Sequence, residues 1–385
     1  MYALLRPFLF RLEAEQAHRL GMRAARLAQA TAPSLVARTF EYEADVLRQS
    51  LWGLDVPNPV GLAAGFDKNA ELVPFWAALG FGFAEVGSVS AKAAAGNPRP
   101  RAFRLPADQA LVNRMGLNND GALSIAARLA TRPTGRPLGV NLAKTHDPAI
   151  LGDATLDDFR ESFHLLAPHA DYVALNISCP NTTEGKTFED PASLDALLQT
   201  IFEERAALAL DVPVLVKLSP PASDPAGRGQ AAQVGSEMEE VIAVSRAHGV
   251  AGFIATNTAS DRRGLRTSGQ ALEQMGRGGL SGRPLAERST ALVRWLYEHT
   301  EGAVPIIGVG GVASAEAAYA KIRAGASLVQ LYTGLVYEGP GLVRQIKRGL
   351  ARLLLEDGFA SVREAVGADV RAPDAARVAL RSDTA

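Results

Sequence analysis

Short apolar runs that end in Gly, Asn, Ser or Thr recur along the chain from residue 60 onward, and segments with helical periodicity separate most of them. The helical segments include 193–209, 234–248, 284–299 and 314–324. Near-continuous apolar strands that alternate with helices predict a parallel sheet covered on both faces. Eight such units predict a closed (β/α)8 barrel. The eight runs are 60–65, 83–88, 137–142, 171–178, 212–219, 252–258, 304–311 and 328–334.

One motif favours a rival architecture, the doubly wound sheet. Gly308, Gly310 and Ala313 in "GVGGVA" match the dinucleotide fingerprint G-x-G-x-x-G/A between a strand and a helix. The match falls in the seventh strand unit, however, and the next strand supplies Gln330 in place of an acidic residue that would bind a ribose. A glycine turn that presents backbone N–H groups to a phosphate at strand seven of a barrel explains the motif better.

The first 45 residues have a different pattern. Apolar side chains recur there at helical spacing, and residues 1–38 carry six arginines against two glutamates. We expect a small helical hairpin with one apolar face and a basic rim. It either packs over the bottom of the barrel or contacts a membrane surface, and an organellar transit peptide is a weaker alternative. The expected division is an extension over 1–45, a barrel over 46–365 and a polar C-terminal tail over 366–385.

Composition narrows the function classes. Of the 385 residues, 47% are hydrophobic and 21% charged, and the net charge of −1 provides no general attraction for nucleic acid. A single cysteine excludes an intrachain disulfide and any cysteine-ligated cluster, which fits a reducing cytosol. We expect no metal site. No apolar run is long enough to span a membrane, and the N-terminus lacks the apolar core of a signal peptide.

Amide side chains are concentrated where the predicted strands end, which is where a barrel places its active site. An amide offers donors and an acceptor, so the cluster suits a ligand with imide or amide edges, although each Asn alone is more often a loop cap. The strand-end amides are Asn141, Asn176, Asn181 and Asn257, and the loop "LVNRMGLNND" adds Asn113, Asn118 and Asn119.

Three further features are candidates for chemistry. Lys217 lies within the apolar run "VLVKLS", where an ammonium is costly without an anion, so a ligand-facing role is favoured over a surface lysine. Lys68 in "AAGFDKN" is equally well explained as an exposed loop charge. Gly310 and Gly311, followed by "LYTG" at the end of strand eight, match the barrel phosphate site.

Cys179 in "ALNISCPNT" is either a small buried hydrophobe or a thiol that acts as a base. From its residue type alone, burial is the commoner fate. A polar loop directly before Pro180 is a poor place for a core residue, however, and a thiol can be tuned toward a neutral pKa for proton transfer. Ser178 is the competing hydroxyl.

Several ordered motifs together resemble the dihydroorotate dehydrogenase family, FMN enzymes of pyrimidine biosynthesis with a (β/α)8 barrel fold. The resemblance implies oxidation of dihydroorotate to orotate: a base removes a proton from C5 while C6 passes a hydride to FMN. The motifs are "NPVGLAAGFDKN" (58–69), "NRMGLNN" (113–119), "NISCPNT" (176–182), "ATNT" (255–258), "GGLSGRPL" (278–285), "PIIGVGG" (305–311) and "GASLVQLYTG" (325–334).

The resemblance also implies residue roles. It makes Cys179 the base and places Lys217 near the flavin N1, where its charge stabilises the reduced ring. The implied FMN contacts are Ala64, Gly65, Lys68, Ser88, Asn141, Asn176, Lys217, Thr256, Gly282, Gly311, Tyr332 and Thr333. The implied dihydroorotate contacts are Lys68, Asn113, Arg114, Met115, Gly116, Leu117, Asn176, Asn181, Asn257 and Thr258.

The extension resembles the membrane-associated class of the family, in which such helices frame a quinone channel. That class usually carries Ser where this chain has Cys179, and an aromatic where it has Leu117. A 40-residue amphipathic extension favours quinone as the oxidant, with the protein peripheral on the cytoplasmic side of the inner membrane. The alternatives are a soluble acceptor such as fumarate, another FMN-barrel reductase acting on a pyrimidine, and a non-catalytic barrel that binds a phosphorylated ligand.

Overall fold

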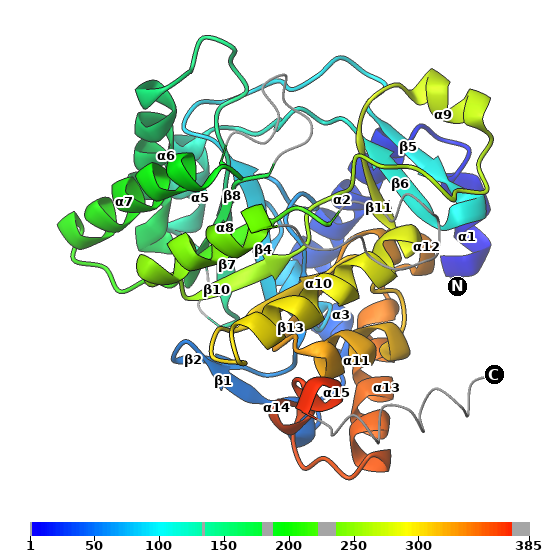
Figure 1. The fold of residues 1–385 in the computed structure, drawn as a ribbon. Coiled ribbons are helices and arrows are strands. Elements are labelled where there is room, and N and C mark those ends of the chain that lie inside the picture. The colour runs from blue at the N-terminus through cyan, green and yellow to red at the C-terminus, as the bar shows by residue number, and fades with distance from the viewer. Residues whose placement is uncertain (1, 133–134, 179–187, 222–235, 372–385) are drawn as a thin grey trace.

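Eight parallel strands close into a barrel in the computed structural model, which describes residues 2–132, 135–178, 188–221 and 236–371 (Figure 1). Neighbours around the barrel follow chain order, and the last strand pairs with the first, Val329 opposite Val60. Each strand corresponds to one apolar run of the sequence, so the predicted (β/α)8 barrel is confirmed. The strands are β3 Val60–Leu62, β4 Phe83–Val89, β7 Leu138–Leu142, β8 Tyr172–Asn176, β9 Val214–Leu218, β10 Gly252–Ala255, β12 Ile306–Val309 and β13 Leu328–Leu331.

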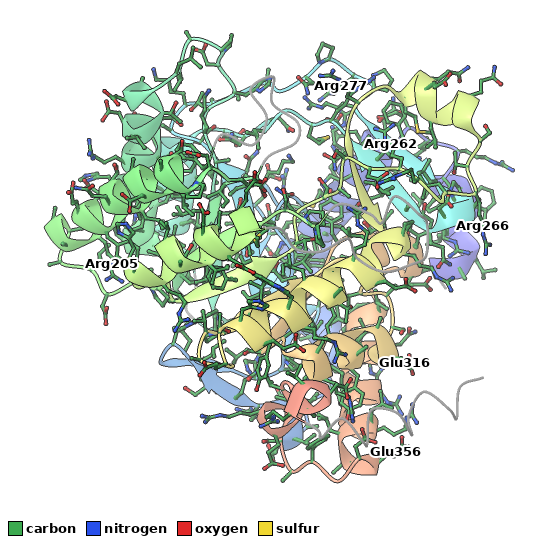
Figure 2. The ribbon with its side chains drawn as sticks, viewed as in Figure 1. Arg205, Arg262, Arg266, Arg277, Glu316 and Glu356 are labelled. Atoms are coloured by element: carbon green, nitrogen blue, oxygen red, sulfur yellow. The ribbon has the colours of Figure 1, made fainter. Side chains whose placement is uncertain are left out.

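Helices between the strands cover the outside of the barrel (Figure 1). They are amphipathic: α13 buries Leu342, Ile346 and Leu350, spaced four residues apart, whereas Glu356 at its end is exposed. Glu316 of α11 is likewise exposed on the outer surface (Figure 2). The covering helices are α4 Val73–Ala78, α5 Ala122–Leu129, α6 Asp153–Leu166, α7 Pro191–Ala207, α8 Ser236–Ala247, α10 Ala286–His299, α11 Ala315–Ala324 and α13 Leu342–Glu356.

A hairpin and a packed layer of side chains close the amino ends of the strands. Strands β1 Gln49–Leu51 and β2 Leu54–Val56 form the hairpin, and Trp52 at its turn donates from Nε1 to the Ala251 carbonyl at 2.9 Å. Above it, the Tyr172 and Phe83 rings fill the barrel interior so closely that Gly139 and Gly61 have no room for a Cβ. Among the described residues, these contacts close the amino ends, and the cavity lies at the carboxyl ends of the strands.

A small antiparallel sheet beside the carboxyl ends was not predicted from the sequence. It consists of β5 Ala102–Leu105, β6 Ala110–Asn113 and β11 Gly279–Gly282, in the order β11-β6-β5. Its own apolar cluster includes Leu105, Val112 and Leu280, with α9 Gly269–Met275 packed nearby. This sheet extends the wall of the barrel mouth.

The N-terminal extension forms three helices, α1 Tyr2–Leu9, α2 Ala14–Thr31 and α3 Pro33–Phe40. Glu13 caps α2 by accepting from the Glu15 and Gln16 N–H groups, and α3 begins at a proline. Helix α2 contacts β5 and α4 at the carboxyl end of the barrel, so the alternative that placed this segment over the barrel bottom is wrong. In the described part of the chain, no helix is both long and apolar enough to cross a membrane.

Short helices complete the fold. Tyr332 and Thr333 begin α12, and α15 is held by Asp369, which accepts from Arg323 Nε at 2.7 Å. The remaining elements are α12 Thr333–Glu338, α14 Val362–Ala365, α15 Ala368–Arg371 and the 3-10 turns η1 Asp45–Leu47, η2 Pro106–Asp108, η3 Ala167–His169 and η4 Arg283–Leu285.

Candidate active site

One cavity of about 910 Å³ runs from the barrel mouth to the N-terminal helices. Most residues that the sequence singled out line it. Of the residues predicted to contact FMN, those on its wall are Ala64, Gly65, Lys68, Ser88, Asn176, Lys217, Thr256, Gly282, Gly311, Tyr332 and Thr333. Of the residues predicted to contact the substrate, those on its wall are Lys68, Asn113, Met115, Leu117, Asn176, Asn257 and Thr258.

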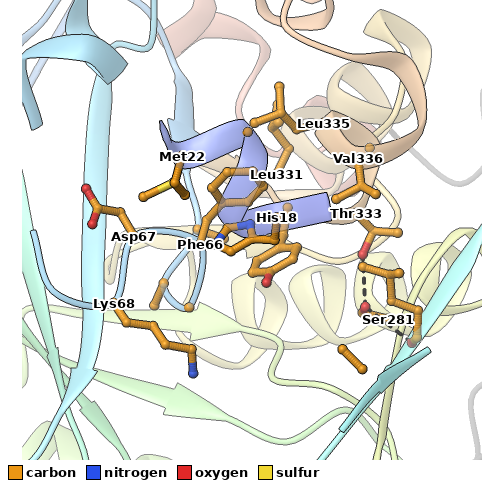
Figure 3. Close-up of a pocket in the computed structure, with 18 of the residues that line it drawn as sticks. His18, Met22, Phe66, Asp67, Lys68, Ser281, Leu331, Thr333, Leu335 and Val336 are labelled. Atoms are coloured by element: carbon orange, nitrogen blue, oxygen red, sulfur yellow. Dashed lines mark hydrogen bonds between the residues drawn. The ribbon is translucent and has the colours of Figure 1, made fainter. Parts of the chain in front are cut away.

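Lys68 reaches into the cavity from the loop after β3, and Asp67 holds that loop in place (Figure 3). The fully buried Asp67 carboxylate accepts from the Glu71 and Leu72 N–H groups, both at 2.8 Å, and from Trp76 Nε1 at 2.9 Å. Burial raises the pKa of Asp67, and these three donors oppose that rise. The anchored loop therefore presents the Lys68 ammonium to the cavity.

The predicted amides form a continuous hydrogen-bonded chain across the ends of four strands. Ser88 Oγ donates to Asn141 Oδ1 at 2.5 Å, and Asn176 Nδ2 donates to Ser88 Oγ at 3.1 Å. Asn257 Nδ2 continues the chain to Asn176 Oδ1 at 3.0 Å and to the Ser178 carbonyl at 2.9 Å. Asn141 is fully buried behind Ser88 and does not line the cavity. Asn141 therefore contacts Ser88 and Glu85 and not the cavity.

Below this chain, Lys217 has a buried anionic partner that the sequence analysis did not single out. Lys217 Nζ lies 3.5 Å from Glu85 Oε1, and the two side chains are 7% and 0% exposed. Glu85 also accepts from Asn141 Nδ2 at 3.0 Å, Tyr172 OH at 3.2 Å and Gln330 Nε2 at 2.8 Å. Burial, followed by the charge of Glu85, raises the pKa of Tyr172 far above its ordinary value. The network fixes an ammonium group in the cavity wall beside the amides, because Lys217 is the register neighbour of Asn176 on the adjacent strand.

Glycines form the cavity wall near strands β12 and β13. Gly311 has φ +71°, and a Cβ there would lie 2.4 Å from the Ala286 Cβ at the start of α10. Gly282, at φ +101°, likewise leaves no room for a side chain. Ser281 Oγ and Thr333 Oγ1 lie 2.9 Å apart beside them (Figure 3). Exposed backbone and two hydroxyls suit an anionic group such as a phosphate.

Within the loop 113–117, the structure separates the predicted contacts. Asn113, Met115 and Leu117 line the cavity, whereas Arg114 and Gly116 do not. The Arg114 guanidinium donates to the carbonyls of Met275 at 2.6 Å and Pro100 at 3.0 Å, and lies over the Phe103 ring.

Cys179 and Asn181 lie outside the described residues. Their neighbour Ser178 is fully buried, and its hydroxyl donates to the Lys217 carbonyl at 3.2 Å. Ser178 Oγ also lies 3.2 Å from Asn257 Nδ2, from which it can accept. The Ser178 side chain is not part of the cavity wall.

The far end of the cavity is mostly apolar and is closed by α2. His18 and Met22 face Phe66 and Leu335 there (Figure 3). The His18 and Phe66 rings meet edge to face at 5.0 Å, and desolvation together with the charge of Lys68 lowers the pKa of His18. The sequence analysis missed His18 because a lone histidine in an amphipathic helix carries no distinguishing pattern.

Comparisons with known proteins agree with this geometry. The model of the family "Dihydroorotate dehydrogenase" matches residues 46–354. A "Dihydroorotate dehydrogenase (quinone)" from Roseiflexus sp. (strain RS-1) is 45% identical over 97% of this chain and 99% of that relative, and one from Cereibacter sphaeroides (strain KD131) is 47% identical over 93% and 95%. The crystal structure of DHODH in complex with ferulenol from Eimeria tenella superposes with a TM-score of 0.77, at 33% identity over 90% of this chain and 96% of that one. The chain therefore belongs to the dihydroorotate dehydrogenase family.

Proposed function

We propose that this protein oxidises dihydroorotate to orotate in pyrimidine biosynthesis, with a bound flavin, FMN, as the hydride acceptor and a quinone as the final oxidant. The observation that carries the proposal is the cavity of about 910 Å³, in which the amide chain lies beside a fixed ammonium and an apolar end opens toward the N-terminal helices. When bound, FMN supplies a two-electron acceptor for the hydride that leaves C6 of the substrate.

The cavity wall fits FMN. The region around Gly282 and Gly311, with the Ser281 and Thr333 hydroxyls, would hold the phosphate. A Cβ at either glycine would collide with neighbouring protein atoms and force this part of the wall to shift. Lys217 would lie along the ring, where a fixed positive charge stabilises a reduced, anionic flavin. The other proposed contacts are Ala64, Gly65, Lys68, Ser88, Asn176, Thr256 and Tyr332, with Asn141 acting through Ser88.

Dihydroorotate carries a carboxylate and two ring amide edges, and the cavity wall offers partners for both. We assign the carboxylate to the Lys68 ammonium and the ring edges to Asn113, Asn176 and Asn257, whose amides donate and accept. Asn181, Thr258 and the loop from Asn113 to Leu117 complete the proposed contacts, although the Arg114 side chain is directed elsewhere.

Cys179 is the proposed base that takes the C5 proton. The support comes from its neighbour, because the Ser178 hydroxyl is buried and already hydrogen-bonded to the Lys217 carbonyl and Asn257. A thiol with a pKa near the working pH is a more effective base than a serine hydroxyl without an adjacent base. The C5 proton thus goes to the Cys179 sulfur as C6 loses its hydride.

The extension suits a quinone and a membrane surface. The apolar end of the cavity lies between α2 and Phe66, where a lipid-soluble acceptor can approach without crossing the substrate site. Exposed Arg11, Arg19 and Arg23 suit anionic headgroups on the cytoplasmic face of the inner membrane. The exposed apolar side chains of this segment are Leu4, Leu5, Phe8, Leu12, Leu20, Leu27 and Leu35.

Anaerobic flavin absorbance tests the proposal. Dihydroorotate should bleach the FMN-loaded wild type, Cys179→Ala should bleach at least 100-fold more slowly, which is the usual contribution of a general base, and Ser178→Ala should stay within a few-fold of wild type. A wild type that binds FMN but is not bleached would point to another flavin reductase. Equal rates in Cys179→Ala would remove the thiol from the mechanism. Re-oxidation of the bleached enzyme by a quinone, but not by fumarate, identifies the acceptor.

A further inference from the structure

A buried acid at the start of the extension holds two arginines that lie just before β5. Glu15 is 7% exposed, and its carboxylate accepts from Arg101 Nε at 3.1 Å and from Arg101 Nη2 at 3.0 Å. Arg99 binds the same carboxylate through Nε at 3.1 Å. Burial of Glu15 raises the pKa of its carboxyl, but hydrogen bonds from Arg101 and Arg99 outweigh burial, and the pKa ends below its ordinary value. Helix α2 is thereby attached to the barrel mouth by a two-point contact.

The same arginine also holds the loop that we assign to dihydroorotate. Arg101 is 3% exposed, and its Nη1 donates to the carbonyls of Ala95 at 2.7 Å and Asn97 at 3.0 Å. It also reaches the Met115 carbonyl at 3.5 Å. Met115 lines the cavity, so one guanidinium bridges the extension and the substrate loop.

The segments around that bridge are packed as a unit. The Asn97 N–H donates to the Met115 carbonyl at 3.0 Å, and Asn97 Nδ2 donates to the Arg114 carbonyl at 2.9 Å. A Cβ on Gly96 would lie 2.2 Å from the Met115 carbonyl oxygen. Because the backbones of residues 96–97 and 114–115 are in direct contact, a shift of the Arg101 guanidinium displaces the Met115 backbone as well.

We infer that Glu15 and Arg101 are positioning residues that hold the substrate loop, residues 113–117, in its binding shape, so that the helical extension also sets the affinity for dihydroorotate. This inference rests on the proposed function for the identity of the ligand. Without the Glu15 charge, the buried Arg101 guanidinium is left unpaired. It moves toward another anion or toward water and thereby loses its hydrogen bonds to the carbonyls of the loop. The effect falls on binding, because the described hydrogen bonds and ion pairs of Arg101 and Glu15 do not include Lys217.

The coupling is reciprocal. If α2 stabilises the loop, then a ligand on the loop must stabilise α2 by the same factor. Orotate, the reaction product, should therefore slow hydrogen exchange of the α2 amides although it binds at the other end of the bridge. If the contact between Glu15 and Arg101 held the extension in place without affecting the loop, orotate would not change the exchange of the α2 amides.

The test measures the substrate half-reaction without quinone, on the FMN-loaded full chain. Glu15→Gln keeps the shape of the side chain and removes its charge. Glu13→Gln is the matched control, because Glu13 caps the same helix and makes no described contact with the loop. We expect the Kd of orotate, read from the flavin spectrum, to rise at least tenfold in Glu15→Gln and less than twofold in Glu13→Gln. The limiting rate of flavin bleaching at saturating dihydroorotate should stay within twofold of wild type.

Arg101→Lys keeps the charge but cannot bridge Glu15 and three carbonyls at once, so it should also weaken orotate binding. It serves as the second variant if Glu15→Gln does not fold. An unchanged orotate Kd in a folded Glu15→Gln or Arg101→Lys protein, with a raised KM for quinone alone, overturns the inference. Failure of the wild type itself to bleach would instead refute the proposed function.

Discussion

Removal of the Glu85 charge should destabilise the barrel far more than removal of a surface carboxylate. Glu85 Oε1 and Lys217 Nζ lie 3.5 Å apart with almost no solvent exposure. At an effective dielectric constant near 20, their attraction is about 5 kcal/mol, and breaking a buried pair typically costs about 3–5 kcal/mol because one charge stays behind unpaired. Unfolding entropy of about 2 cal/mol/K per residue over roughly 320 barrel residues converts that loss to a fall of about 5–8 °C in Tm.

The assay is thermal unfolding of Glu85→Gln, Lys217→Met and the double variant, each with FMN in excess. Glu316→Gln is the control, because Glu316 is exposed. Its ion pair with Arg352, at 3.8 Å, lies on the surface, where such a pair contributes at most about 1 kcal/mol. The double variant leaves no unpaired charge, so it should lose about 1–3 kcal/mol less than the two single changes together. Two results would refute this account of the network. One is a Glu85→Gln protein with the same Tm as the Glu316→Gln control, and the other is a double variant whose loss of stability equals the sum of the two single losses.

Three further predictions concern other parts of the molecule. Burial lowers the pKa of Lys321 from 10.5 to about 7, so the unfolded chain binds more protons between these values. Wild-type stability should therefore rise with pH across that window, by up to about 1.4 kcal/mol per pH unit, relative to Lys321→Met; parallel pH profiles would contradict this. Gly311→Ala should weaken FMN binding at least tenfold in a flavin titration, because the new Cβ would collide with Ala286. An unchanged affinity would show that the phosphate binds at another site. The pair Leu5→Ser and Phe8→Ser should release the protein from anionic lipid vesicles in a sedimentation assay without slowing flavin bleaching by dihydroorotate, and full retention would place the membrane contact on another surface.

The barrel was predictable because its strands are buried on both faces and therefore appear as unbroken apolar runs. Seven of the eight runs contain a whole barrel strand, for example β9 within 212–219, and β4 extends one residue beyond the run 83–88. The sheet formed by β5, β6 and β11 escaped prediction because its strands have only four residues each, and two of the four in β11 are glycines. Four residues are too few to establish an alternating pattern.

Charged residues of the site were predictable to different degrees. Lys217 stood out as an ammonium inside an apolar run, and Glu85 in "FAEVGS" carries the same signal but was not singled out. The contact between Glu15 and Arg101 had no local signal, because the two residues are 86 positions apart and each belongs to an ordinary polar segment. Only the folded chain brings them together.

The contact between Glu15 and Arg101 has a consequence for how relatives of this protein diverge. The two buried side chains neutralise each other's charge. Replacement of one of them by an uncharged residue leaves the other as an unpaired buried charge, and selection removes such a variant before a second change can follow. The two positions should therefore covary across the family. Relatives without the N-terminal helices have no glutamate to pair with the arginine, so in them the arginine should have been replaced, which would record the loss of the extension in the sequence of the barrel itself.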